Sequence, residues 1–134
     1  SILLAQTDIL HIELASNIRP LAQEGNSFAL GTVEYGQTDW PVYTLDTALS
    51  PLNTMPAQRR LVACLNHTGR QLALACDTVT TLQIDADAII EELPEIMRGH
   101  HSPIEALLYS NGNLHFISSA GALMGMMMHR EAQE

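Results

Sequence analysis

The sequence RRLVACLNHTGRQLALACDTVTTLQI, residues 59–84, contains the clearest strand signals in the chain. Two apolar runs, 61–65 and 71–76, flank a turn cluster of Asn, His, Thr and Gly at 66–69, and this arrangement predicts a β-hairpin. A further run at 79–84 predicts a third strand behind the hairpin. Because short strands need partners on both edges, we expect this unit to lie at the centre of a β-barrel.

Alternation within 71–76 predicts which face of the hairpin is buried. Leu72 and Leu74 alternate with Gln71, Ala73 and Ala75, and successive side chains of a strand point to opposite faces. We therefore expect the two leucines to face the core, with the small residues on the other face.

The only two cysteines, Cys64 and Cys76, both lie in the predicted hairpin and could face each other. Two buried free thiols are the favoured interpretation, because apolar strands are where free cysteines usually lie. A disulfide would need an oxidising compartment. This cysteine usage predicts a cytoplasmic protein.

The rest of the chain also consists of short strands joined by turns. Asn111-Gly112 between two apolar runs is the strongest short-range hairpin signal, and Ser118 or Ser119 can cap a final helix over 120–130. The other predicted strands lie at 2–4, 9–14, 28–35, 40–45, 104–108 and 114–117, with turns at 36–39 and 109–113. A turn or short helix is predicted at 6–8, and short helical turns are predicted at 46–49 and between Asp85 or Asp87 and Pro94.

Three hairpins with little helix predict an all-β barrel or sandwich with short helices, and not a βαβ fold. A length of 134 residues predicts a single domain, 1–134. Segments 33–49 and 107–123 both run strand, turn, strand and short helix, which indicates two similar, barrel-like halves.

The charge of the chain excludes several classes of partner. Fifteen acidic residues stand against six arginines, there is no lysine, and the formal net charge is −9. Nucleic acids and anionic membrane surfaces require clustered positive charge, so we expect neither nucleic-acid binding nor membrane insertion. The acidic surface suits docking onto a basic patch of a protein.

No pattern of reactive residues predicts catalysis, a metal or another cofactor. The adjacent pair His100-His101 points in two directions, and the other histidines lack metal-ligand spacing. The acidic segment 85–95 lacks the spacing of a calcium loop and reads as a solvated face. Methionines 124 and 126–128 either pack the last helix against the barrel or line an adaptable binding surface.

With these elements placed, the sequence resembles the CheW-like domain of bacterial chemotaxis signalling. One family signature is similar to Gly31-Thr32-Val33-Glu34-Tyr35-Gly36 followed by Trp40-Pro41-Val42-Tyr43-Thr44-Leu45. A second is similar to Ala75-Cys76-Asp77-Thr78-Val79, and a third to the strand 112–117 before the final helix.

The resemblance implies two small five-stranded β-barrels around a shared core, with the first strand cut short here. It also implies a non-enzymatic adaptor that couples a chemoreceptor-like protein to the regulatory domain of a CheA-type histidine kinase. Two departures bear on that role: Tyr35 stands in place of the family's receptor-contacting arginine, and Thr44 in place of an aspartate. A divergent regulatory or sensor domain, binding a small ligand or another protein without a kinase partner, is the alternative.

The resemblance places the protein-binding surface at the hairpin 31–41. We expect the contact residues to be Tyr35, Gly36, Gln37 and Trp40, because aromatic side chains at a turn provide large contact area at low entropic cost. Trp40 could instead pack beneath the hairpin, which would leave Tyr35 as the exposed aromatic residue.

Overall fold

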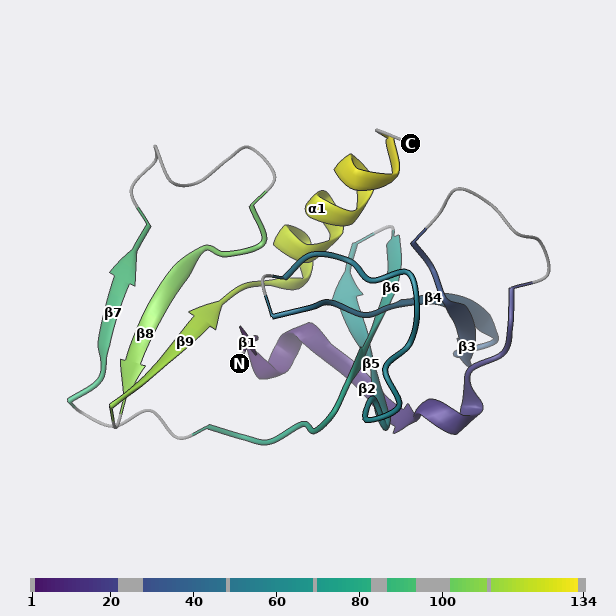
Figure 1. The fold of residues 1–134 in the computed structure, drawn as a ribbon, viewed down its shortest axis with the longest axis horizontal. Coiled ribbons are helices and arrows are strands. Elements are labelled where there is room, and N and C mark those ends of the chain that lie inside the picture. Colours follow the sequence, from purple (N-terminus) through teal and green to yellow (C-terminus); the bar gives the residue numbers. More distant parts are fainter. Residues whose placement is uncertain are drawn as a thin grey trace.

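The computed structural model describes residues 2–21, 28–47, 49–68, 70–82, 87–93, 102–110 and 112–132. Within this part of the chain there are short strands, two 3-10 turns and one helix (Figure 1). In chain order the elements are β1 (Ile2–Leu3), η1 (Gln6–Asp8), β2 (Ile9–Leu14), η2 (Ala15–Asn17), β3 (Gly31–Tyr35), β4 (Thr38–Tyr43), β5 (Leu61–His67), β6 (Arg70–Cys76), β7 (Ile89–Glu92), β8 (Ala106–Ser110), β9 (Asn113–Ile117) and α1 (Ala120–Ala132).

The strands form two sheets, which confirms the predicted all-β class with short helices. The first sheet has the strand order β2-β5-β6-β4-β3, and the second has the order β1-β9-β8-β7. The described residues thus give five strands in one half and four in the other. Strand β1 pairs in parallel with β9, with Ile2 opposite Phe116, so the start of the described chain joins the sheet formed near its end. Helix α1 runs between the two sheets (Figure 1).

The central hairpin is confirmed, but both of its faces are buried. Strands β5 and β6 pair in antiparallel register, and Leu72 lies on the face that packs against α1. Leu74, on the same face, is half-buried. The prediction that the small residues lie outside the core is wrong, because Ala73 and Ala75 are only 0% and 4% exposed. They fill a second apolar cluster enclosed by the curl of the sheet.

Curling of the first sheet brings its two edge strands together. The ring of His11 on β2 stacks on the ring of Tyr35 on β3, with centroids 4.5 Å apart and planes 10° apart. Just after η2, the Arg19 N–H donates to the Thr32 carbonyl at 2.7 Å, and the Thr32 N–H donates to the Arg19 carbonyl at 2.9 Å. These contacts close the sheet around the second cluster, which contains Val33, Trp40, Val42, Val62, Cys64, Ala73 and Ala75.

Most local signals were correct, and the exceptions have non-local causes. The short helix predicted before Pro94 is wrong: residues 89–92 form strand β7, because pairing with β8 outweighs the capping signal. Residues 79–82 are not a strand, and the rest of that predicted run lies outside the described residues. The predicted helical turn at 46–49 is a hydrogen-bonded turn, in which Leu49 has φ +62° and the Leu49 N–H donates to the Asp46 carbonyl.

The terminal helix begins as predicted from its capping serines. The Ser119 hydroxyl accepts a hydrogen bond from the Ala122 N–H at 3.0 Å. The Asp8 carboxylate of η1 accepts from the Ala120 N–H at 3.1 Å, a favourable position for a negative charge at a helix N-terminus. Helix α1 then buries Leu123, Met124, Met126 and Met127, so packing accounts for three of the four methionines.

Barrel closure predicts a specific glycine requirement. A Cβ at Gly31 would lie 2.4 Å from a methyl carbon of Ile18 and 2.6 Å from the Arg19 carbonyl oxygen. We expect Gly31→Ala to lower the free energy of unfolding by about 1–3 kcal/mol, as other overpacking substitutions do, measured by urea unfolding.

Gly125 is the matched control, because a Cβ there meets nothing within 4 Å. Gly125→Ala should leave stability unchanged or raise it by about 0.5–1 kcal/mol, since Gly is a poor residue inside a helix. Equal stability of Gly31→Ala and the wild type would contradict the closure described here.

Candidate functional site

The β3–β4 hairpin ends in a tight turn. Tyr35 pairs with Thr38, so the turn is formed by Gly36 and Gln37 alone, which have φ +61° and +64°. Two successive positive φ values are typical of a type I′ turn, whose twist matches that of the flanking strands. The turn is shorter than the predicted 36–39, because Thr38 and Asp39 already pair within β4.

The aromatic residues of the hairpin lie at different depths. Trp40 is 7% exposed and belongs to the cluster inside the curled sheet. Its indole N–H donates to the Tyr35 carbonyl at 3.0 Å, and the two rings meet edge to face at 5.9 Å. Tyr35 is half-buried, while Gly36 and Gln37 are exposed. Of the four predicted contact residues, Tyr35, Gly36 and Gln37 therefore form the accessible tip, and Trp40 supports them from below.

Polar residues surround the place where the sheet closes. His11 Nε2 lies 3.0 Å from a Glu13 carboxylate oxygen, and the Arg19 guanidinium lies 3.6 Å from the Glu34 carboxylate. A shallow depression is lined by Glu13, Asn17, Arg19 and Glu34. No local sequence pattern indicates these neighbours, because they come from β2, η2, the segment just after η2 and β3, and meet only when the sheet curls.

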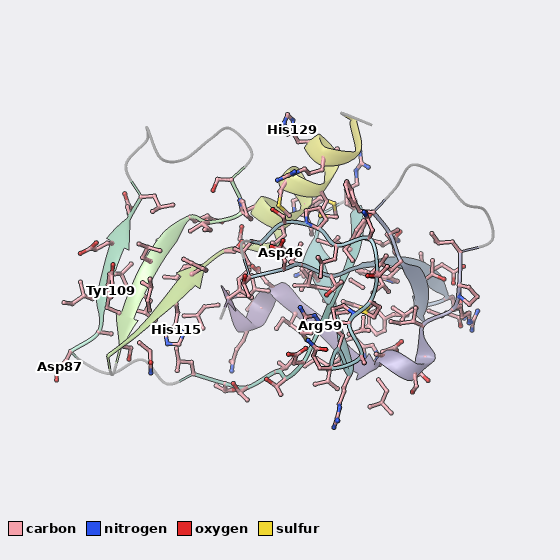
Figure 2. The ribbon with its side chains drawn as sticks, viewed as in Figure 1. Asp46, Arg59, Asp87, Tyr109, His115 and His129 are labelled. Atoms are coloured by element: carbon pink, nitrogen blue, oxygen red, sulfur yellow. The ribbon has the colours of Figure 1, made fainter. Side chains whose placement is uncertain are left out.

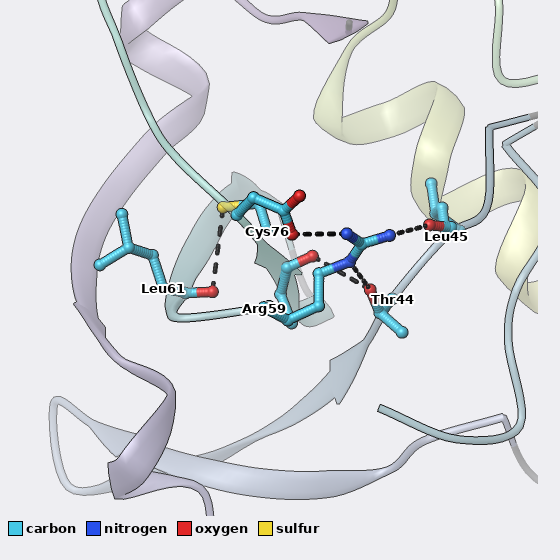
Figure 3. A network of polar contacts seen from close by, with 7 residues as sticks. Thr44, Leu45, Arg59, Leu61 and Cys76 are labelled. Carbon is cyan, nitrogen blue, oxygen red and sulfur yellow. Dashed lines mark hydrogen bonds and ion pairs between the residues drawn. The ribbon is translucent and has the colours of Figure 1, made fainter. Parts of the chain in front are cut away.

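A partly buried polar network fixes the other end of β4 (Figure 3). The Arg59 guanidinium donates to the Thr44 hydroxyl at 2.9 Å, to the Leu45 carbonyl at 3.0 Å and to the Asp77 carboxylate at 2.5 Å. The Thr44 hydroxyl in turn donates to the Ala75 carbonyl at 3.2 Å. Thr44 is fully buried. One arginine before β5 therefore joins the end of β4 to the end of β6, and this connection holds the base of the hairpin.

The two cysteines do not face each other, contrary to one of the sequence expectations. Cys64 is opposite Ala73, and Cys76 is opposite Leu61, which places the two side chains on opposite faces of the sheet. Both are free thiols.

Burial raises the pKa of Cys64 to about 11, with a further contribution from the Glu13 carboxylate. Burial and the Asp77 carboxylate also raise the pKa of Cys76. Both shifts disfavour the reactive thiolate form.

Within the described part of the chain, no three His, Cys, Asp or Glu side chains come together as metal ligands. His115 on β9 and His129 on α1 lie far apart in Figure 2. His100 and His101 lie outside the described residues.

Ser119 has a structural role, since its hydroxyl caps α1 and also contacts the Glu105 carboxylate. Of the helices that the structure describes, none has the length and apolar character to cross a membrane.

The curled five-stranded sheet, the smaller second sheet and the terminal helix between them define a CheW-like fold. The structure is similar to the crystal structure of the scaffolding protein TtCheW from Thermoanaerobacter tengcongensis, with a TM-score of 0.65. The similarity covers 86% of this chain and 78% of that chain, at 16% sequence identity. No model of a known protein family matches the sequence, and no curated protein matches it. The predicted resemblance is therefore confirmed at the level of the fold.

The polar network predicts that substitution of Arg59 lowers the stability of the protein, whereas substitution of its neighbour Arg60 does not. Arg59→Met should lower the free energy of unfolding by about 2–4 kcal/mol, because it leaves the buried Thr44 hydroxyl and Leu45 carbonyl without their donor. Arg60 is exposed, and Arg60→Met should change stability by less than about 0.5 kcal/mol. Chemical denaturation measures both, and equal effects of the two substitutions would rule out the proposed role of Arg59.

The buried Cys64 thiol predicts a loss of stability at alkaline pH. Its pKa is 9.0 in the unfolded chain and about 11 in the folded protein, so the unfolded state releases its proton first as the pH rises. The wild type should therefore lose about 1 kcal/mol relative to Cys64→Ala between pH 7 and pH 10. Urea unfolding of both proteins at the two pH values measures this difference. A constant difference would show that Cys64 ionises normally in the folded state.

Proposed function

We propose that this protein is a non-enzymatic adaptor that couples a chemoreceptor-like protein to the regulatory domain of a CheA-type histidine kinase in the cytoplasm. The observation that carries the proposal is the similarity to the scaffolding protein TtCheW over 86% of the chain. Two further features support it. The cysteine thiols are held in their unreactive form, and the net charge of −9 suits a basic protein partner.

The tip of the β3–β4 hairpin is the proposed contact surface. Tyr35 is held between the His11 ring and the edge of Trp40, so little side-chain entropy is lost when it meets a partner. Gly36 has no side chain to obstruct close approach, and the exposed Gln37 amide can donate and accept hydrogen bonds. A rigid aromatic ring beside an adaptable polar group is typical of binding surfaces.

The substitution of tyrosine for the family's arginine changes the chemistry of this contact. A guanidinium would contribute charge-assisted hydrogen bonds, which weaken as salt screens them. Burial of the Tyr35 ring contributes mainly through apolar area, which salt does not screen. We therefore expect the loss of affinity caused by Tyr35→Ala to depend only weakly on ionic strength, even if the affinity of the whole complex depends on salt.

Identification of the partner tests the function itself. Affinity capture from the source cell should recover a receptor or a CheA-type kinase, and isothermal titration calorimetry with the purified partner should confirm direct binding. Recovery of neither, together with a small molecule that stays bound through purification, would favour the sensor domain described above.

Substitution of Tyr35 tests the site. Tyr35→Ala should weaken the purified complex by about 1–2 kcal/mol, as expected for an interface anchor. His11→Ala removes the stacking partner but leaves Tyr35 in place, so it should weaken binding less. Met128→Ala is the control, because Met128 is exposed on α1, away from the hairpin tip, and its substitution should leave the affinity unchanged. Unchanged affinity of Tyr35→Ala, with its melting temperature intact, would remove this hairpin from the interface.

A further inference from the structure

The outer edge of β7 differs from the other three sheet edges. Strand β1 has only two residues. The edge of β2 is interrupted by a register shift between Ile9 and His11 and meets β3 through the His11–Tyr35 stack. The edge of β3 is covered by its bridge to Arg19. Short strands, bulges and covered edges are the usual means of preventing unwanted strand pairing. Among the described residues, no strand pairs with the outer edge of β7.

Strand β7 is also exposed along its whole length. All four of its residues are exposed, and Ile89 and Ile90 are 58% and 59% accessible. Among the large hydrophobic residues of the described chain, only Leu14, at 58%, is exposed to a similar degree. The edge is therefore both open and apolar in its first half, a combination that natural proteins normally avoid unless a partner covers it.

An apolar row continues from β7 across the second sheet. Ile89 lies opposite Tyr109 of β8, and Tyr109 lies opposite Leu114 of β9. Residues opposite one another in antiparallel strands lie on the same face. Tyr109 and Leu114 are 40% and 46% exposed. Figure 2 places Tyr109 on β8, beside β7. The row therefore provides a continuous apolar surface that begins at the open edge.

The second half of β7 determines the charge of the partner. Glu91 and Glu92 are both exposed, and Asp87 lies just before the strand. With a net charge of −9 on each copy, a second copy of this chain would be repelled from an acidic edge. A segment with basic residues opposite the glutamates and apolar residues opposite the isoleucines would be attracted.

We propose that β7 is a docking edge for an extended, basic and apolar segment of a partner protein, which adds to the second sheet as a further strand. Main-chain hydrogen bonds to β7 provide the affinity, and the apolar row and the two glutamates provide the specificity. This surface belongs to the second sheet, and the proposal does not depend on the role of the β3–β4 hairpin in the first.

A designed peptide tests the proposal without a natural partner. The probe is a fluorescein-labelled octapeptide with the sequence Val-Val-Lys-Lys repeated twice, so that valines can lie opposite Ile89 and Ile90 and lysines opposite Glu91 and Glu92. Fluorescence anisotropy at low salt measures its binding to the full chain. Ile89→Thr/Ile90→Thr removes the apolar contact and keeps β-branched residues, whereas Glu91→Gln/Glu92→Gln removes the charge. Each double variant should weaken binding at least about tenfold, with an unchanged melting temperature.

Two controls separate strand addition from non-specific attraction. Leu10→Thr/Ile12→Thr makes the same type of change at exposed apolar residues of β2, and it should leave affinity unchanged. The same peptide with alternate amides N-methylated cannot form the full set of main-chain hydrogen bonds, and it should bind at least about tenfold more weakly.

The proposal is overturned if the unmodified peptide does not bind, if the N-methylated peptide binds equally well, or if the β2 variant loses as much affinity as the β7 variants. It is also overturned if sedimentation shows a dimer of the wild type that the β7 variants do not form. In that case a second copy of the chain would occupy the edge.

Discussion

Burial of the β5–β6 hairpin on both faces is the constraint on which the rest of the structure depends. A strand exposed on one side needs apolar residues only at alternate positions, but here successive residues of β5 enter two different clusters. Leu65 and Leu72 fill the space beneath α1, where large side chains fit. Cys64, Ala73 and Ala75 point into the curled sheet, where they belong to one cluster with Trp40. The hairpin therefore determines both where the helix packs and how tightly the sheet closes.

Closure of the sheet then determines the shape of the candidate site. Because the edges β2 and β3 meet, Tyr35 gains a stacking partner that lies 24 positions earlier in the sequence. The absence of a side chain at Gly31 allows the segment at Arg19 to approach β3. At the other end of β4, Arg59 holds Thr44 and Leu45 against the end of β6. The hairpin tip is thus a small exposed surface on a support that is fixed at both ends.

Local signals in the sequence predicted the elements that local interactions form. The three hairpins, the 3-10 turn at Gln6–Asp8 and the serine-capped helix follow from turn residues, alternation and capping, and all were found. The His11–Tyr35 stack, the Arg59 network and strand β7 depend on residues that are distant in sequence, and no local pattern indicates them. The same limit applies to the site. The sequence indicated the hairpin 31–41 as a candidate site, which stays a prediction, and the structure separates the supporting Trp40 from the exposed Gly36 and Gln37.

The two departures from the family pattern have different physical consequences. Thr44 is fully buried, and its hydroxyl both accepts from Arg59 and donates to the Ala75 carbonyl. An ionised aspartate could accept from Arg59 but has no proton to donate to that carbonyl. The threonine is therefore satisfied entirely within this chain, and its presence reflects the internal hydrogen bonding of the domain. Tyr35 is different, because its ring reaches the surface beside an exposed turn. Contacts within the domain explain how the Tyr35 ring is held. The part of the ring that reaches the surface can also contact another molecule. The tyrosine is thus the departure that changes the chemistry of the exposed candidate site.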